Sequence, residues 1–475
     1  MTTQPLHLGP SRFGVPPEAA FIPPARLDQE GTAGPRHCAW LDLLCFTLLG
    51  YALFGKGFAY LGLPPLFIGD AVLLLGVLWL LVLTRTTSVV LSSPPVWLLL
   101  LLMGWGLVRT WPYLARYRVD ALRDAALYGY AAFAPVVFGV IVARPWRLAA
   151  LLRRYSVFAR VFLAAVPVVW LGSRFFGDAI PRWPWADVPI VHAKGGDLLV
   201  HLAGVLAFWA AGTGRYRPFW LLLLAVNVGL VGAYNRGGLI SFLLVFAVCG
   251  LFRPLAGALW RITAVITITL LLLAVTDLRF RMPGKGREVS FSQLAGNVLS
   301  VVGESEEQEL DGTKQWRLNW WGDIVNYTVN GPYFWTGKGF GINLADDDGY
   351  QGTAWEGQLR SPHNGHLTVL ARAGVPGLAL WLLVHAAWAA EMLNRYLQAK
   401  AAGRRRWQGA FLFLLAYWAA FMANASFDVF IEGPMGGIWL WTVYGAGLAA
   451  VWAYRHHPEI LDDNLDQAAP GAARR

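Results

Sequence analysis

The chain has 475 residues, of which 56% are hydrophobic and only 14% are charged, and it contains 24 Trp. This composition excludes a soluble globular protein of similar length and indicates a membrane protein. The formal net charge of +10 is compatible with nucleic acid binding. Arginines in short loops beside anionic lipid, together with an anionic substrate, explain it better.

Residues 1–38 are polar, rich in Pro and Gly, and contain no apolar core, which argues against a cleavable signal peptide. We predict cytoplasmic tails over residues 1–38 and 455–475, with disorder in the first and, in the second, after about Pro458. Three cysteines, Cys38, Cys45 and Cys249, lie in or beside apolar segments without metal-ligand spacing, and they predict no disulfide framework.

Apolar runs long enough to cross a bilayer recur along the chain. They lie at about 39–54, 66–84, 94–111, 121–143, 156–173, 197–213, 217–234, 238–253, 259–276, 365–390, 409–426 and 436–454. The pattern predicts an all-α polytopic membrane protein with about 12 transmembrane helices, helices 1–9 within residues 39–276 and helices 10–12 within residues 365–454. Residues 54–66 are predicted to form a turn or a half-buried loop.

Several short loops between the predicted helices are rich in arginine. These loops all lie on one side of the membrane if both chain ends lie on that side as well. Because cytoplasmic loops carry an excess of positive charge, we predict that this side is the cytoplasm. Their cations are Arg144, Arg147, Arg153, Arg154, Arg215, Arg217, Arg253, Arg261, Arg395, Lys400, Arg404, Arg405 and Arg406. The long polar segment 277–364 then lies outside, between helices 9 and 10. Because it contains Trp316, Trp320, Trp321, Trp335 and Trp355, we expect a folded periplasmic domain with short helices.

The predicted external side carries many cations, which departs from the usual charge bias and indicates an anionic substrate. They are Arg109, Arg116, Arg118, Arg123, Arg174, Arg182, Lys194, Arg236, Arg279, Arg281, Lys285, Arg287 and Arg317. The alternative for any one of them is a position at the headgroups or an ion pair with a nearby carboxylate. The candidates for such pairing are Asp120, Asp124, Asp178 and Asp187.

The long segment ends at Ser361-Pro362-His363-Asn364. Ser361 is a favourable N-cap and Pro362 a favourable first helical residue, so a helix is predicted to begin here with His363 in its first turn. The positive end of the helix dipole disfavours a charged imidazole and favours an anion nearby. His363 is therefore a candidate proton acceptor, and the alternative is that it only caps the helix or lies among the headgroups.

Three motifs, in this order, resemble the bacterial O-antigen ligase and O-antigen polymerase superfamily. Asn235-Arg236-Gly237-Gly238 resembles the family's arginine at the external start of a helix. The segment from Arg317 to Trp321, with Pro332 and the run Gly337-Lys-Gly-Phe-Gly, resembles its loop pattern. His363-Asn364, nine residues and then Gly374-x-x-Gly377 resembles its signature at the junction of the external loop and the next helix. Arg372 departs from the acidic residue of many members, so it receives no role.

The resemblance implies an inverting, metal-independent glycosyltransferase without a cofactor. Such an enzyme moves a glycan from undecaprenyl diphosphate to an acceptor hydroxyl, a glycan or lipid A-core, on the periplasmic face of the inner membrane. His363 is the expected general base, and Arg236 and Arg317 are expected to bind the diphosphate. We expect substrate contacts from Asn364, His366, Trp321 and Arg123. Besides donor, acceptor and membrane lipid we expect no nucleic acid and a monomeric protein.

Two rival functions remain open at this point: a polymerase that joins lipid-linked repeat units, and a transporter or flippase of lipid-linked sugars. The absence of repeats argues against the transporter. Asp346-Asp347-Asp348 could bind a divalent cation, but a solvated loop is favoured. For Gly337–Gly341 a tight turn is favoured over a phosphate loop, and Gly374 and Gly377 are expected to allow close helix packing.

Overall fold

The computed structural model describes residues 38–214, 216–253, 308–351 and 359–461, with short stretches between 260 and 289. The chain divides into two units, Met1–Cys38 and Ala39–Arg475, and the description below concerns the second. Its described residues are helical apart from loops and two small hairpins. These pair β1 (Gly62–Leu63) with β2 (Leu66–Phe67) and β3 (Phe280–Arg281) with β4 (Glu288–Val289). The all-α class predicted from the apolar runs is confirmed.

Long helices lie at the predicted apolar runs. They are α1 (Ala39–Phe54), α3 (Ile68–Val82), α5 (Pro94–Thr110), α9 (Phe133–Ala143), α10 (Arg147–Phe175), α11 (Gly195–Ala210), α12 (Pro218–Gly232), α13 (Arg236–Phe252), α18 (Gly365–Ala401), α19 (Arg405–Ala425) and α20 (Pro434–His456). Short helices are α2 (Lys56–Ala59), α4 (Thr84–Leu91), α6 (Leu114–Tyr117), α7 (Val119–Asp124), α8 (Ala126–Tyr130) and α17 (Leu344–Asp347). Helix α16 (Gln308–Val329) has 22 residues and lies in the long polar segment.

Five helical segments among the described residues are long and apolar enough to cross a membrane. They are Pro94–Tyr117, Ala126–Ala143, Arg147–Phe175, Gly365–Ala401 and Arg405–Ala425, and the pair α3 and α4, bent by 99°, could form a sixth. These segments support a helical membrane protein. The total of about twelve spans stays a prediction, because four further apolar helices are shorter and the run 259–276 lies mostly outside the described residues.

The predicted turn at residues 54–66 consists of α2 and the β1–β2 hairpin. Phe58 is buried and packs edge-on against Tyr51, whereas Leu63 at the hairpin is exposed. The prediction of a half-buried connection is confirmed.

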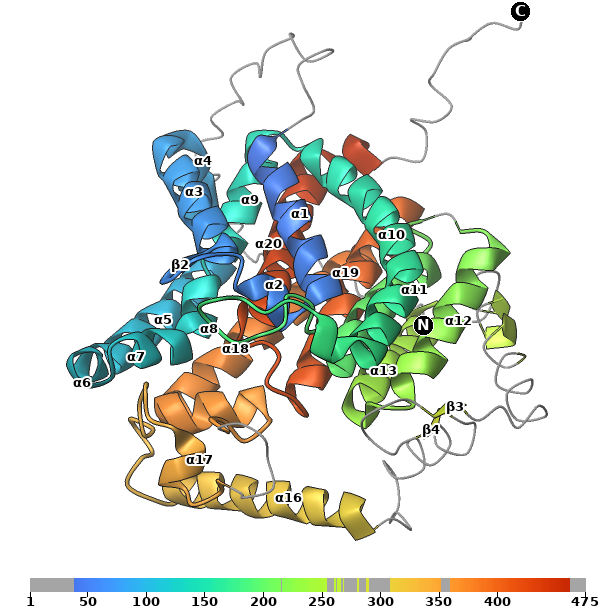
Figure 1. Cartoon of the computed structure of the whole chain (residues 1–475). Helices are drawn as coiled ribbons and strands as arrows, with labels where there is room; N and C mark the ends of the chain where they lie inside the picture. Colours follow the sequence, from blue (N-terminus) through green and yellow to red (C-terminus); the bar gives the residue numbers. More distant parts are fainter. Residues whose placement is uncertain are drawn as a thin grey trace, which may run out of the picture. The chain divides into compact units, whose positions relative to one another are not determined.

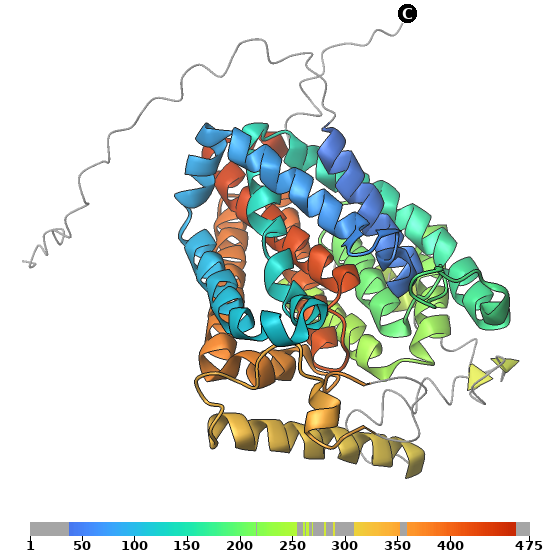
Figure 2. The same ribbon diagram turned by 60° about the vertical axis from the view of Figure 1, so that its left-hand side comes forward.

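Helix α11 lies in the centre of the fold and is buried at every residue. Helices α13 and α19 pack against it (Figures 1 and 2). A Cβ atom at Gly238 would lie 2.9 Å from the Cα atom of Gly196, so the N-terminal turns of α11 and α13 meet backbone to backbone. The predicted site residue Arg236 begins one of these two turns.

Helices α16 and α17 pack on the first turns of α18, and Figures 1 and 2 show α16 lying across that end of the helices. A buried apolar cluster joins them: Trp320, Ile324, Leu344, Ala345, Leu370 and Ala371. Where the sequence predicted short helices, residues 308–351 contain one helix of 22 residues, α16, and one short helix, α17. The side of the membrane on which they lie stays a prediction. Arg279, Lys285, Arg287, Trp355 and, from the cytoplasmic set, Arg215 lie outside the described residues.

Helix α18 is broken at Gly374, whose φ of 72° and ψ of −175° are not helical. Glycine is needed there because a Cβ atom would lie 2.6 Å from the carbonyl oxygen of Phe334. The backbone N–H groups of Lys338 and Gly339 donate to the carbonyls of Ala371 and Arg372 at 2.7 and 3.1 Å. The glycine run is thus a turn that packs against α18, as predicted. Close packing is also confirmed at Gly377, where a Cβ atom would lie 3.0 Å from Trp105 Nε1.

A buried ion-pair cluster ties this turn to the helices. Asp124 at the end of α7 accepts hydrogen bonds from Gly341 N at 2.9 Å and Arg360 Nη2 at 3.1 Å, and its carboxylate lies 3.0 Å from Arg372 Nη1. Arg372 also donates to the carbonyls of Gly339 and Ile342 at 3.2 and 3.1 Å. Arg372, to which the sequence assigned no role, therefore holds the glycine turn on α18.

Glu432, in the loop between α19 and α20, lines a small pocket with Asp124, Tyr128 and Arg372. Burial raises the pKa of Glu432 to about 7, although Thr368 and Arg372 act in the opposite direction. The Glu432 carboxyl group therefore stays protonated at pH values where an exposed glutamate has lost its proton.

The raised pKa of Glu432 predicts a pH-dependent stability. Between pH 4.5 and about 7 the folded chain holds a proton that the unfolded chain has released, so the free energy of unfolding falls as pH rises through this window. Glu432→Gln should remove that contribution. Thermal unfolding of the purified chain between pH 5 and 8 should show a smaller decline for the variant than for the unmodified protein. The exposed carboxylate variant Glu459→Gln is the control and should keep the original decline. Equal declines for Glu432→Gln and the unmodified protein would contradict the assignment.

Candidate functional site

The helix that follows the long loop begins later than predicted. Asn364 is its N-cap, in an extended conformation, and Asn364 Oδ1 accepts hydrogen bonds from the backbone N–H groups of His366 and Leu367, each at 3.1 Å. The prediction that Ser361 caps the helix and that His363 lies in its first turn is wrong, because the Asn364 side chain satisfies these N–H groups itself.

His363 lies immediately outside this helix, with a φ of 53°. Left-handed backbone is uncommon for residues other than glycine, and it costs free energy that the surrounding structure must supply. Trp321 Nε1 in α16 donates to the carbonyl of Pro362 at 2.8 Å, and so attaches the loop helix to the residue before His363. The histidine is therefore held in a strained position at the positive end of α18.

The side chain of His363 faces Asp428, which lies in the loop between α19 and α20. Their Nδ1 and Oδ1 atoms are 3.6 Å apart, and both side chains are only 17% exposed. Asp428 Oδ1 also accepts from its neighbour Val429 N at 2.7 Å and from Lys194 Nζ at 3.4 Å. A largely buried carboxylate thus connects a histidine and a lysine that are far apart in sequence.

Charge neighbours determine the ionisation of this group. Burial by itself would raise the pKa of Asp428, but Lys194 and His363 lower it well below its usual range. Burial opposes the charge on Lys194, yet Asp428 and Asp197 outweigh it and raise the pKa of Lys194. Asp428 is therefore an anion and Lys194 a cation at neutral pH.

Arg317 and Arg236 complete the cluster. Arg317 Nη1 donates to the carbonyl of Phe427 at 3.2 Å. Burial lowers the pKa of Arg317, Asp428 raises it, and the nearby positive charge of Arg236 lowers it, so both groups lie close to this guanidinium. A Cβ atom at Gly237 would lie 2.8 Å from Phe427 Cβ, which places the start of α13 against the same loop. The predicted catalytic residues Arg236, Arg317 and His363 are thus gathered around Phe427 and Asp428.

The predicted substrate-binding residues have other partners in the structure. Asn364 caps α18, and Trp321 bonds to Pro362. His366 accepts from Trp381 Nε1 at 3.0 Å, and its Nε2 lies 3.2 Å from the carbonyl of Met422, so it packs between helices. Arg123 is half exposed and pairs with Asp120 at 2.9 Å. Arg123 Nε also lies 3.8 Å from Asp124 Oδ1.

The acidic run 346–348 is not a solvated loop throughout. Asp348 is 3% exposed and accepts from Trp320 Nε1 at 2.6 Å, and Lys338 pairs with both Asp347 and Asp348. The prediction of a solvated run is wrong for Asp348, because one lysine and one indole draw it into the interior. No group of three or more His, Cys, Asp or Glu that could hold a metal ion occurs in the part of the chain that the structure describes.

Sequence reasoning missed Asp428 and Glu432, and it named Lys194 only as one of many cations. A signal was present, because both acids lie in the short connection 426–433 between two apolar runs. Ionisable residues at membrane depth are costly, so acidic residues there are candidates for function just as arginines are. Neither acid belongs to a recognisable motif, and only the packing of the loop 426–433 against the start of α18 brings Asp428 beside His363.

A comparison with curated proteins gives no match. A family model described as O-antigen ligase matches residues 219–382. The matched part includes α13, α16 and the first half of α18, and with them Arg236, Arg317 and His363. Asp428 lies beyond it. The resemblance to the O-antigen ligase and O-antigen polymerase superfamily that the motifs predicted is therefore confirmed for residues 219–382.

Proposed function

We propose that the chain is an inverting glycosyltransferase of the O-antigen ligase type that works without a metal ion. It moves a glycan from undecaprenyl diphosphate to an acceptor hydroxyl of lipid A-core, on the periplasmic face of the bacterial inner membrane. The observation that carries the proposal is His363 beside Asp428 with Lys194, Arg236 and Arg317 around the same loop.

The base in this proposal is His363. Its Nδ1 faces the carboxylate of Asp428, so a proton on Nδ1 is favoured and Nε2 is the nitrogen that takes the proton of the acceptor hydroxyl. As the hydroxyl oxygen attacks the anomeric carbon, the bond from that carbon to the diphosphate oxygen breaks. The imidazolium that forms is stabilised by Asp428, which is itself kept ionised by Lys194.

The leaving diphosphate is anionic, and three cations offer it compensation. Arginine can contact two phosphate oxygens at once, and Arg236 and Arg317 lie near one another despite eighty intervening positions. Lys194 adds a point charge at the start of α11. Positive charge prepared before the reaction stabilises the negative charge that develops in the transition state, and here protein cations supply it. Attack from the side opposite the diphosphate inverts the anomeric carbon.

Purified protein given a lipid-diphosphate glycan and lipid A-core should release undecaprenyl diphosphate, and EDTA should leave the rate within about twofold, because protein cations supply the charge that Mg²⁺ supplies elsewhere. The measurement is release of the carrier by chromatography. A parallel reaction with a second lipid-linked repeat unit as acceptor tests the polymerase. Loss of transfer with EDTA and recovery with Mg²⁺ or Mn²⁺ would refute metal independence.

Replacement of the base should affect turnover more than binding. His363→Ala should lower kcat by about 10²–10⁴-fold while donor affinity changes little, since a general base acts mainly in the transition state. Asp428→Asn should also lower kcat, though less, because the imidazolium that forms loses the carboxylate that faces it. The exposed His457 provides the control variant His457→Ala. Near-normal turnover of His363→Ala would remove the base assignment.

Arg317→Lys should also fail, although it keeps the charge. A lysine is a point charge that cannot make two parallel hydrogen bonds to a phosphate, so we expect kcat/KM to fall about tenfold or more. The control is Arg182→Lys, at an exposed arginine that pairs with Asp187 at 3.0 Å. Steady-state kinetics with the donor varied checks this, and equal kcat/KM for Arg317→Lys and the control would contradict a bidentate role.

A further inference from the structure

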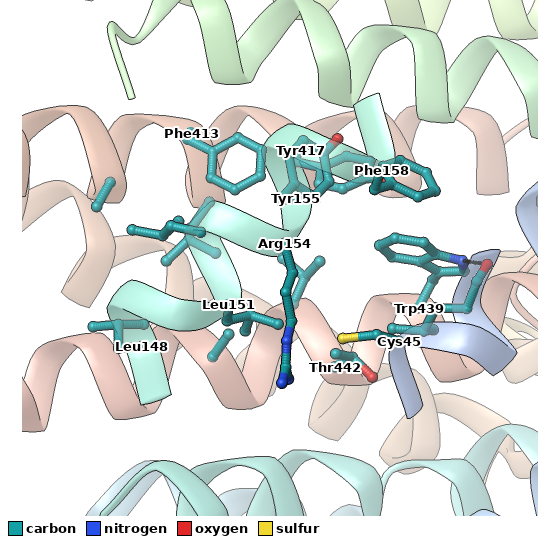
Figure 3. A pocket seen from close by; sticks show the side chains of 16 residues that line it. Cys45, Leu148, Leu151, Arg154, Tyr155, Phe158, Phe413, Tyr417, Trp439 and Thr442 are labelled. Carbon is teal, nitrogen blue, oxygen red and sulfur yellow. Dashed lines mark hydrogen bonds between the residues drawn. The ribbon is translucent and has the colours of Figure 1, made fainter. Parts of the chain in front are cut away.

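A second cavity, partly open to the outside, lies between α1, α10, α19 and α20 (Figure 3). Its walls are almost wholly apolar and include Leu148, Leu151, Phe158 and Phe413. It is separate from the site described above. Asp428 follows the C-terminal end of α19, whereas residues 410–417 from the first half and middle of that helix line this cavity.

The few polar groups of the wall lie on one side of the cavity. Figure 3 shows Arg154, Cys45 and Thr442 at this side, with Phe413, Tyr417, Tyr155 and Phe158 at the other. Thr442 is 4% exposed, and its hydroxyl has no hydrogen-bond partner. A buried hydroxyl without a partner is costly, and it indicates that a ligand atom belongs beside it.

Arg154 supplies the charge. Its Nη2 pairs with Asp42 of α1, while its buried Nη1 atom has no hydrogen-bond partner. A guanidinium has five N–H donors, so one carboxylate leaves donors over. Arg154 is the eighth residue of α10, close to Arg147 and Arg153 at the same end of that helix. This concentration of positive charge attracts an anionic headgroup.

We infer that the cavity binds one anionic glycerophospholipid of the surrounding bilayer. One acyl chain fills the apolar part, and the phosphate and ester oxygens accept hydrogen bonds from Arg154 Nη1 and the Thr442 hydroxyl. A phospholipid fits better than the lipid carrier of the proposed reaction, because the polar side of the cavity lies near the arginine-rich start of α10 and the carrier's diphosphate belongs at the opposite end of α19. The choice of a phospholipid over the carrier rests on the proposed function, whereas the presence of a lipid site in this cavity does not.

Native mass spectrometry of the delipidated full-length protein tests this inference. Dioleoylphosphatidylglycerol is titrated, with dioleoylphosphatidylcholine and undecaprenyl phosphate in parallel. We expect one phosphatidylglycerol per chain, bound more tightly than either alternative. Arg154→Met should weaken its binding about tenfold or more, and Thr442→Val about fivefold, since a charge-assisted hydrogen bond and a neutral one are lost respectively.

Ala446→Phe, which fills the cavity from α20, should abolish binding, and its thermal unfolding midpoint shows whether it folds. The matched control is Arg160→Met, at an exposed arginine further along the same helix that does not line the cavity, and it should bind as the unmodified protein does. Unchanged phosphatidylglycerol binding by Arg154→Met and Thr442→Val would overturn the proposal. Tighter binding of undecaprenyl phosphate, weakened by the same variants, would also overturn it, because the cavity would then belong to the carrier.

Discussion

The candidate site depends on one buried carboxylate, Asp428. It lies within 3.6 Å of His363 Nδ1 and 3.4 Å of Lys194 Nζ, which belong to segments distant in sequence. A carboxylate with burial this high remains ionised only if cations surround it, and cations gathered this closely repel one another unless an anion lies among them. Each charge therefore makes the position of the others possible. The cluster keeps a net positive charge, which can bind an anionic substrate.

Backbone geometry fixes the position of His363 relative to Asp428. The break at Gly374 lets α18 change direction, and the glycine turn 337–341 packs into the break through hydrogen bonds from Lys338 and Gly339. Arg372 and Asp124 then hold that turn in place from within. Because these contacts fix the first turns of α18, they also fix Asn364 and the strained His363 before it. The histidine and glycines of the motif thus belong to one structural unit, in which the histidine faces Asp428 and the glycines allow the loop to approach.

The two ends of the helix bundle are specialised in different ways. Near the start of α18 the polar groups are numerous, paired and largely enclosed by α16 and the loop 426–433. Near the start of α10 a single arginine and a threonine border an apolar cavity, and hydrogen-bonding atoms of both have no partner there. The first arrangement suits the stabilisation of changing charge during a reaction, and the second suits the static binding of an amphipathic molecule.

The sequence by itself determined the class of the protein, the place of most helices and the three residues at the centre of the site. Hydrophobic periodicity and length are local properties, and the motifs around Arg236, Arg317 and His363 are local as well. It placed the start of α18 too early, because Ser361 and Asn364 are both good caps and only the folded backbone selects between them. Only the tertiary structure decided that Asp428 is the partner of His363, that Arg372 is a structural anchor and that Arg123 pairs with Asp120. Ion pairs between distant segments follow from which helices pack together, and no local pattern of residues records that choice.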